Sequence, residues 1–307
     1  MAEADRPVGF VGVGAMGSRM VRRLAGQGFR VVAFDRNPAA AGAVETPPQV
    51  VAVPTLAGLA DCEIVITMLP DDRAVRECAL GAGEGPGFAD VLAPGSLLLD
   101  MSSSAPQSTV ELGRTFAQRG LRLADAPVSG GVARAEQGTL AIMTGGEEAD
   151  LARCRPLLEA MGSHIVHVGG VGAGHAAKAL NNMLSAAGLV VAVEVLAVGA
   201  RFGLDPSVLL QVLNSSTGKN NSTEHKIAQQ VLSRAFGAGF SMRLMRKDLA
   251  TALDLAHQTG IPVPVSAACF EVWEAAMRQL ESEGDVDHTA IARYVEQQAD
   301  VVLRAPP

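Results

Sequence analysis

The chain contains few aromatic residues, few charged residues and only four cysteines. Charged residues make up 19% of its 307 residues. Phenylalanine, tyrosine and tryptophan together make up 4%, and this low aromatic fraction argues against an aromatic-rich binding surface. The cysteines form no Cys-x-x-Cys pair. This excludes a disulfide framework and a zinc site and predicts reduced, mostly buried thiols. They are Cys62, Cys78, Cys154 and Cys269.

Basic runs and long apolar segments are missing as well. The net charge is −7, so we expect neither nucleic acid nor an anionic membrane as a partner. Residues 1–7 contain no apolar core typical of a signal peptide. No uncharged apolar run reaches the roughly 20 residues of a membrane span, since Glu194 interrupts Leu189–Ala200. We therefore expect a cytoplasmic protein.

Glycine is abundant, with 33 residues, and short apolar runs alternate with helical patterns in the first half of the chain. Near-continuous apolar strands separated by helices predict a parallel sheet that is covered on both faces. The expected strands lie at 8–11, 30–35, 63–69, 96–100, 121–125, 141–144 and 165–168.

The pattern becomes helical from Ala173 onward. A long apolar helix is expected to reach Phe202, with Gly203 as its C-cap, and Asp205-Pro206 has the composition of the next helix start. We therefore predict a doubly wound α/β domain of the Rossmann type at residues 1–168 and an all-helical domain at 169–307. The long helix would join the two domains.

A glycine-rich motif follows the first expected strand and opens a helix. The motif is Gly12-Val13-Gly14-Ala15-Met16-Gly17. Its glycines allow a tight turn, a close approach of the backbone to a pyrophosphate, and packing of helix on strand. Asp35 ends the second strand, where an acid binds ribose hydroxyls and favours NAD, while the neighbouring Arg36 would accommodate NADP. The alternative is a glycine-rich turn beside an unrelated surface acid.

Three further strand ends would face the crevice where ligands bind in open parallel sheets. Each has an alternative interpretation as an ordinary turn. Ser-Gly-Gly after a strand offers a hydroxyl and backbone amides to an anion, but it also suits a flexible turn. The segments are Met68-Leu69-Pro70, Asp100-Met101-Ser102-Ser103-Ser104 and Asp125-Ala126-Pro127-Val128-Ser129-Gly130-Gly131.

Lys178 lies in an apolar helical stretch, with Asn182 one turn further along the same face. A buried lysine has a lowered pKa and can transfer protons, whereas a lysine that extends to water has no such role. Lys247 belongs to a cation cluster that a solvated helix face would explain equally well. His164 and His167 point to opposite faces of a strand, so we expect no metal site.

Four segments in this order resemble the β-hydroxyacid dehydrogenase family, which contains 3-hydroxyisobutyrate dehydrogenase and tartronate semialdehyde (2-hydroxy-3-oxopropionate) reductase. The resemblance extends from Val8 to about Val302. The segments are Gly-Phe-Val-Gly-Val-Gly-Ala-Met-Gly at 9–17, Asp-Ala-Pro-Val-Ser-Gly-Gly at 125–131, Gly-His-Ala-Ala-Lys-Ala-Leu-Asn-Asn at 174–182 and Lys-Asp-Leu at 247–249.

The resemblance implies an NAD(P)-dependent oxidoreductase in which Lys178 is the general acid and base and Asn182 its polar partner. It implies an interdomain cleft for a small 3-hydroxy acid or semialdehyde, and a homodimer or homotetramer built through the helical domain. The substrate carboxylate would be held by Ser129, Gly130 and Gly131, with Lys247 closing the site near the nicotinamide. Cofactor contacts would come from Gly12, Gly14, Ala15, Met16, Gly17, Asp35, Arg36, Met68, Leu69, Pro70, Ser103 and Lys247.

The segments 35–38 and 101–103, and Asp287-His288-Thr289-Ala290 followed by Tyr294, are similar to tartronate semialdehyde reductases. The polar loop 215–221 also favours a polar substrate, so this reductase activity is the first expectation and 3-hydroxyisobutyrate dehydrogenase the alternative. Imine reductases share the expected architecture but usually lack a lysine at the position of Lys178, and 6-phosphogluconate dehydrogenases are mostly longer, so neither activity is favoured. An alternative of a different class is a non-catalytic protein that uses the fold to bind NAD.

Overall fold

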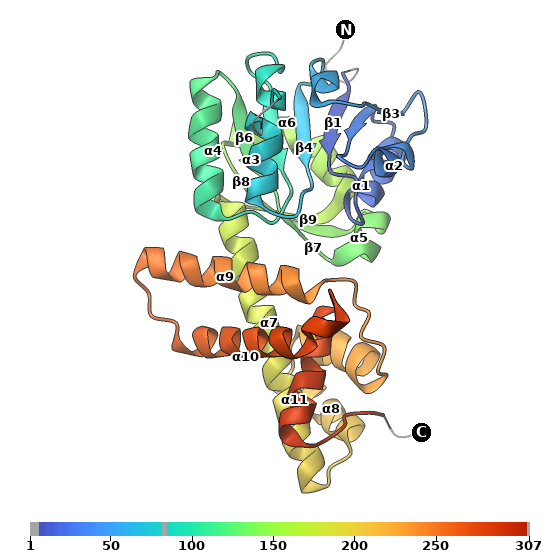
Figure 1. Cartoon of the computed structure of the whole chain (residues 1–307), viewed down its shortest axis with the longest axis vertical. Coiled ribbons are helices and arrows are strands. Elements are labelled where there is room, and N and C mark those ends of the chain that lie inside the picture. Colours follow the sequence, from blue (N-terminus) through green and yellow to red (C-terminus); the bar gives the residue numbers. More distant parts are fainter. Residues whose placement is uncertain (1–5, 82–84, 306–307) are drawn as a thin grey trace. The chain divides into compact units, whose positions relative to one another are not determined.

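The computed structural model describes residues 6–81 and 85–305. The chain divides into two compact units, one ending at Lys178 and the other beginning at Ala179. The first contains a sheet with helices, and the second is helical (Figure 1). This mixed architecture confirms the predicted fold class. The predicted domain boundary at residues 168 and 169 stays a prediction.

The first unit contains a nine-stranded sheet in the described part of the chain, in which neighbouring strands follow the order β3-β2-β1-β4-β5-β6-β8-β7, with β9 beside β8. The strands from β3 to β6 are all parallel, which is the arrangement of a doubly wound sheet. Those strands are β1 (Val8–Val11), β2 (Val31–Phe34), β3 (Val50–Ala52), β4 (Ile64–Thr67), β5 (Leu97–Asp100) and β6 (Arg122–Asp125).

The far edge of the sheet departs from the expected parallel arrangement. β8 (Leu140–Gly145) runs antiparallel to β6 and to β7 (Val128–Ser129), while β9 (Gly162–Gly169) is parallel to β8. An apolar run reads the same in both directions of the strand, so its pattern cannot specify which way it enters a sheet. The two short strands β3 and β7 were not predicted for the related reason that two or three residues show no period.

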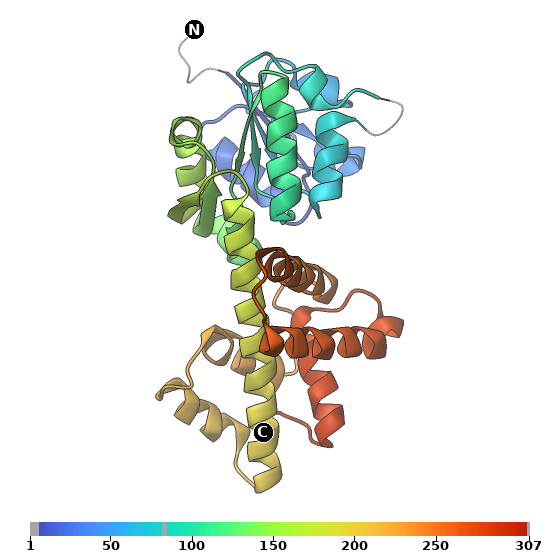
Figure 2. The same ribbon diagram turned by 90° about the vertical axis from the view of Figure 1, so that its left-hand side faces the viewer.

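Alternating side chains of the central strands enter two separate cores. Leu97 and Leu99 pack with α1 (Gly17–Gly26) and α6 (Glu148–Met161) on one face of the sheet. Leu98 packs with α3 (Asp72–Leu80) and α4 (Pro106–Gln118) on the other face, and Figure 2 shows these two helices over the sheet. The period of two therefore buries both faces, as the apolar strands predict. The unit also contains the short helices α2 (Pro38–Gly42) and α5 (Gly131–Gln137) and the 3₁₀ helices η2 (Leu56–Leu59) and η3 (Phe88–Asp90).

The long helix α7 runs from Ala173 to Phe202, and Gly203 follows it at φ +97°. Asp205 caps the next helix through bonds from the Ser207 and Val208 amides. Both predicted helix signals are confirmed. The remaining helices of the second unit are α8 (Pro206–Asn214), the π-helix η4 (Ser222–Leu232), α9 (Met242–Thr259), α10 (Pro264–Leu280), the short 3₁₀ helices η5 (Glu281–Glu283) and η6 (His288–Ala290), and α11 (Ile291–Ala299).

One face of α7 forms the core of the second unit. Ala186, Leu189, Val193 and Leu196 are fully buried there, together with Trp273 of α10. By length and composition α7 could also cross a membrane, and it is the one helix of the described residues that passes this test. Half of its most apolar window is buried within the protein, which is common for the core helix of a helical domain.

Candidate functional site

The loop between β1 and α1 has a conformation that requires its glycines. Gly12 has φ +95°, and a Cβ atom there would lie 2.5 Å from the Met68 carbonyl oxygen. A Cβ atom on Gly17 would lie 1.9 Å from the Gly12 carbonyl oxygen, so helix and strand could not pack together with any larger residue. Gly14 faces open space, with no atom within 4 Å of its Cβ position. The loop thus leaves backbone accessible beside a helix N-terminus, which suits a pyrophosphate.

Asp35 is fixed against this loop at the end of β2. Its Oδ2 accepts a hydrogen bond of 2.9 Å from the Val13 amide, and its Oδ1 accepts one of 2.8 Å from the Asn37 amide. Each carboxylate oxygen keeps a lone pair for a further donor. Arg36 is exposed, and its guanidinium lies 3.9 Å from the Glu77 carboxylate. A carboxylate and a cation are therefore both available at the end of β2.

The segments after β4 and β5 lie side by side at the carboxyl ends of the strands. Thr67 pairs with Asp100 in the parallel register, and the Leu69 amide donates a hydrogen bond of 2.9 Å to the Ser102 hydroxyl. This bond joins the predicted cofactor segment Met68–Pro70 to Ser102, which directly precedes the predicted cofactor residue Ser103. The structure thus brings both next to the turn after β1, because the Met68 amide donates to the Val11 carbonyl.

The Ser-Gly-Gly segment forms the turn from β7 into α5. Gly130 has φ +131° and Gly131 has φ +68°, both in the region that favours glycine. The Arg134 side chain lies over Gly130, since a Cβ atom there would be 2.5 Å from its Cδ atom. Ser129 is half-buried and ends its strand opposite Ala141. The turn therefore has a backbone conformation that favours glycine at both positions.

Lys178 and Asn182 both belong to α7, one helical turn apart. Lys178 is half-buried in the structure. Asn182 is buried, and its Nδ2 donates a hydrogen bond of 2.6 Å to Oδ2 of Asp248 on α9. The other oxygen of Asp248 lies 3.3 Å from the Lys247 ammonium. Asp248 thus connects two of the predicted site residues, a role that the sequence analysis missed although its position beside Lys247 was a signal.

A second buried network surrounds His175, one turn before Lys178 on α7. The ring lies 3.7 Å from the Asp100 carboxylate and 3.6 Å from that of Asp125. Burial raises the pKa of Asp125, although His175 and the hydrogen bonds from the Gly172 and His175 amides act against this shift. The sequence offered His175 only as a neighbour of Lys178, because its partners are distant in the chain.

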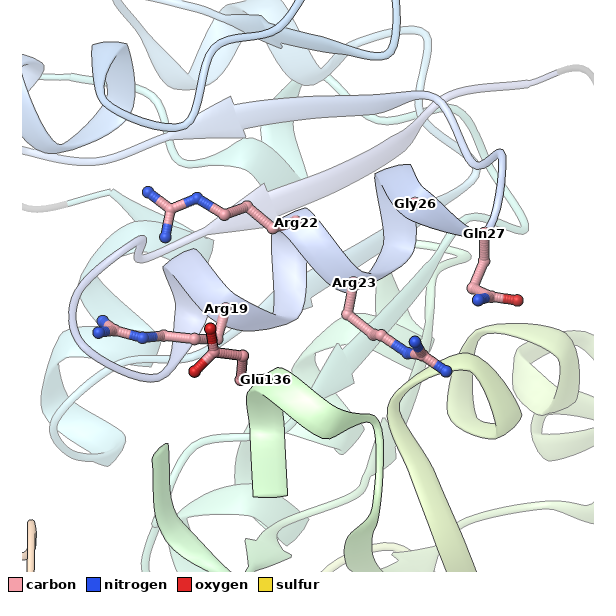
Figure 3. Close-up of a pocket in the computed structure, with 6 residues that line it drawn as sticks. All are labelled: Arg19, Arg22, Arg23, Gly26, Gln27 and Glu136. Atoms are coloured by element: carbon pink, nitrogen blue, oxygen red, sulfur yellow. The ribbon is translucent and has the colours of Figure 1, made fainter. Parts of the chain in front are cut away.

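Two hollows lie on the surface of the described residues. One, of about 560 Å³, lies between α9 and α10 and includes Lys247. The other, of about 230 Å³, lies beside α1 and includes Arg22, Arg23 and Glu136. Figure 3 shows that the guanidinium groups of Arg22 and Arg23 extend in opposite directions, so these cations do not converge on one anion.

The polar features that favoured a polar substrate have structural partners. In the loop 215–221, Lys219 forms an ion pair of 2.8 Å with Glu224, and Asn220 accepts hydrogen bonds from the Ser222 and Thr223 amides. Asp287 likewise accepts bonds from the amides of Gly239, Phe240 and Thr289. Lys219 and Asn220 thus stabilise their own loop, whereas Asp287 joins its turn to the segment at Gly239 and Phe240, which is distant in sequence.

Two family models together match nearly the whole chain. Residues 7–170 match the NAD binding domain of 6-phosphogluconate dehydrogenase. Residues 172–295 match the model described as NAD-binding of NADP-dependent 3-hydroxyisobutyrate dehydrogenase.

Individual relatives cover both units. The chain is 34% identical over 299 residues to 2-(hydroxymethyl)glutarate dehydrogenase of Eubacterium barkeri, covering 97% of this chain and 98% of that protein. It is 37% identical over 291 residues to 3-hydroxyisobutyrate dehydrogenase of Pseudomonas aeruginosa, covering 92% and 95%. The solved structure of Mycobacterium tuberculosis 3-hydroxyisobutyrate dehydrogenase with L-serine is similar with a TM-score of 0.83 and 32% identity, covering 94% and 98%.

Proposed function

The chain belongs to the β-hydroxyacid dehydrogenase family of NAD(P)-dependent oxidoreductases, and we propose that it interconverts a small 2-substituted 3-hydroxypropanoate and its semialdehyde. The relatives are named for 3-hydroxyisobutyrate and 2-(hydroxymethyl)glutarate. Both molecules, like glycerate, carry a hydroxymethyl group and a carboxylate on the same carbon. They differ only in the third substituent, so the shared part defines the expected chemistry.

Lys178 is the proposed general acid and base. In the oxidation, the neutral amine of Lys178 accepts the hydroxyl proton while hydride leaves the carbon that bears the hydroxyl group. In the reduction, the ammonium returns a proton to the carbonyl oxygen. The bound nicotinamide supplies the hydride acceptor or donor. The observation that carries this proposal is the arrangement on α7, where Lys178 is followed after one turn by Asn182, whose amide Asp248 fixes from α9.

The remaining site residues bind and orient the reactants in this proposal. Ser129 and the backbone amides of Gly130 and Gly131 hold the carboxylate, and Lys247, paired with Asp248, approaches the nicotinamide. The glycine loop, Met68–Pro70 and Ser103 hold the cofactor. Asp35 favours NAD, because its carboxylate repels a 2′-phosphate. Arg36 is the residue that would support NADP.

The first candidate for the third substituent of the substrate is a small apolar group, as in 3-hydroxyisobutyrate. The names of the Pseudomonas aeruginosa and Mycobacterium tuberculosis relatives support this choice, whereas the Eubacterium barkeri relative is named for a substrate whose third substituent carries a carboxylate. The polar loop 215–221 and Asp287, which favoured tartronate semialdehyde, use polar groups in an ion pair and hydrogen bonds within the second unit. Glycerate with tartronate semialdehyde is the second pair, since the sequence segments at 35–38 and 101–103 resemble reductases of that substrate.

We also propose that α7 mediates association of identical chains. Its solvent side carries six exposed large apolar side chains at helical spacing, while its other side forms the core of the second unit. A continuous apolar stripe of this length is typical of a protein interface. The residues are Leu180, Leu184, Val191, Val195, Val198 and Phe202.

The test compares wild type and Lys178→Ala on a panel of substrates. Turnover is measured as the change in NADH or NADPH absorbance. Both enantiomers of 3-hydroxyisobutyrate, D-glycerate and 2-(hydroxymethyl)glutarate are tested with each oxidised cofactor. We expect Lys178→Ala to lose about 10³-fold or more in kcat, at the upper range for one general acid–base residue, and to keep wild-type NAD affinity. Retained turnover in this variant would contradict the proposed role of Lys178.

A further inference from the structure

The N-terminal turn of α7 is held by a carboxylate from a distant strand. Oδ1 of Asp125, at the end of β6, accepts a hydrogen bond of 2.6 Å from the Gly172 amide, and Oδ2 accepts one of 2.8 Å from the His175 amide. These amides lie just before and within the first turn, where a helix has no internal acceptors and attracts negative charge. Asp125 therefore acts as an N-cap supplied from about fifty residues away.

The close approach of Asp125 depends on the glycine at the second position of the helix. A Cβ atom on Gly174 would lie 2.7 Å from Oδ2 of Asp125 and 2.4 Å from the Met143 carbonyl oxygen. Any larger residue would push α7 away from the strand ends. The start of the helix is thus specified by tertiary contacts as well as by its own sequence.

The His175 side chain adds a second attachment. The ring is fully buried, with Nδ1 2.9 Å from the Thr109 hydroxyl on α4 and Nε2 3.2 Å from the Ser102 carbonyl oxygen. A carbonyl oxygen can only accept, so Nε2 carries a proton in this arrangement. The ring thereby fixes α7 to α4 on one side and to the segment after β5 on the other.

The segment that His175 contacts is part of the proposed cofactor site. The Ser102 amide donates a hydrogen bond of 3.0 Å to the Asp100 carboxylate, and the Ser102 hydroxyl accepts one of 2.9 Å from the Leu69 amide. Ser103, a proposed cofactor residue, follows directly. One hydrogen bond from His175 therefore connects the segment proposed to contact the cofactor with the helix that carries Lys178.

We propose that His175 is a positioning residue, which places Lys178 relative to the cofactor segment after β5. This inference rests on the proposed function of Lys178. Three residues along a helix correspond to a rise of about 4.5 Å and nearly one turn, so a tilt or slip of the first turn displaces the ammonium. Catalysis is sensitive to such displacements, since a misplacement of about 1 Å can cost on the order of 100-fold in rate.

The experiment compares His175→Leu, His175→Gln and Thr109→Val in the full-length protein. Leucine removes both ring contacts, glutamine can restore a donor toward Ser102, and valine removes only the partner of Nδ1. The control is Cys154→Ala, a fully buried position in α6 outside the site. Each variant is measured for kcat, KM, NAD affinity, melting temperature and the primary deuterium isotope effect with substrate deuterated at the hydroxymethyl carbon.

We expect His175→Leu to lower kcat by about 10- to 100-fold and to raise the isotope effect, with KM and NAD affinity within about 3-fold of wild type. His175→Gln should recover most of the rate, and Thr109→Val should lose a few-fold in kcat. If His175→Leu fails to fold, the contrast between Thr109→Val and the control carries the same test.

A kcat in the ring variants equal to that of Cys154→Ala would overturn the inference, as would a loss confined to NAD affinity or to melting temperature. Lys178→Ala separates this result from a failure of the proposed function. Should that variant stay active, the role of Lys178 itself is wrong. Should it be inactive while Thr109→Val and His175→Leu match the control, only the positioning role is wrong.

Discussion

Removing the Asp248 carboxylate should weaken the second unit and the proposed site together. Asp248 is 2% exposed, and it accepts a 2.6 Å hydrogen bond from Asn182 while facing the Lys247 ammonium at 3.3 Å. In Asp248→Ala the Asn182 amide loses this acceptor in a buried place. A hydrogen bond to a charged group contributes about 1.5–3 kcal/mol, so we expect the free energy of unfolding to fall by about 2–3 kcal/mol.

A double-mutant cycle with Asn182→Ala isolates the pair. Each single substitution removes the same hydrogen bond, so the double variant should lose less than the sum, with a coupling energy of about 1–2 kcal/mol. Trp273 makes the assay specific, because it is the one tryptophan of the chain and is fully buried in the core of the second unit. Its fluorescence during urea unfolding reports this unit.

The cycle needs a matched activity measurement. Asn182→Ala and Asp248→Ala should both reduce kcat/KM by at least about 10-fold, with little further loss in the double variant, because the two residues act as one unit. A coupling energy below about 0.3 kcal/mol, with strictly additive losses in kcat/KM, would refute the argument that Asp248 orients Asn182.

Three other expectations concern separate parts of the molecule. Asp35→Ala should raise the dissociation constant for NAD by about 10- to 100-fold, which is the value of a charge-assisted hydrogen bond, and that for NADP by less. Titration calorimetry measures both constants, and equal losses of affinity for the two cofactors would count against Asp35 as the ribose ligand. Burial raises the pKa of the Cys62 and Cys154 thiols to about 12, so at pH 8 only about one in 10⁴ is thiolate, and rapid maleimide labelling of either before unfolding would disprove their burial. Leu184→Glu, at a position 77% exposed on α7, should shift the oligomer toward monomer in sedimentation experiments, and an unchanged mass would exclude Leu184 from the interface.

The sequence predicted the elements whose signals are local. The turn from α7 into α8 follows from Gly203, Asp205 and Pro206, whose conformations depend on their own side chains and immediate neighbours. The glycine motif and Asp35 are equally local, and the loop has the expected geometry. The direction of β8 was not predictable, because strand order and direction depend on pairing partners far along the chain.

The long-range hydrogen bonds of the site could not be predicted in the same way. Asp248 lies 66 residues from Asn182, and Asp125 lies 50 residues from His175. No periodicity connects such pairs, so Asp248 and His175 appeared in the sequence only as members of the segments 247–249 and 174–182. Lys178 is half-buried, which lies between the two alternatives that its sequence left open, since an apolar helix sequence does not specify which turn is covered.

Along α7, Lys178 stands between two residues that buried carboxylates hold. His175 precedes it and is held at its amide by Asp125, while Asn182 follows it and is held at its side chain by Asp248. Each contact is a charge-assisted hydrogen bond from an element distant in sequence, so the helix itself supplies the identity and spacing of the three residues and the tertiary structure fixes their orientation. Substitutions at Asp125 and Asp248 should therefore both alter turnover more than they alter the affinity for NAD, although neither carboxylate exchanges a proton in the proposed reaction.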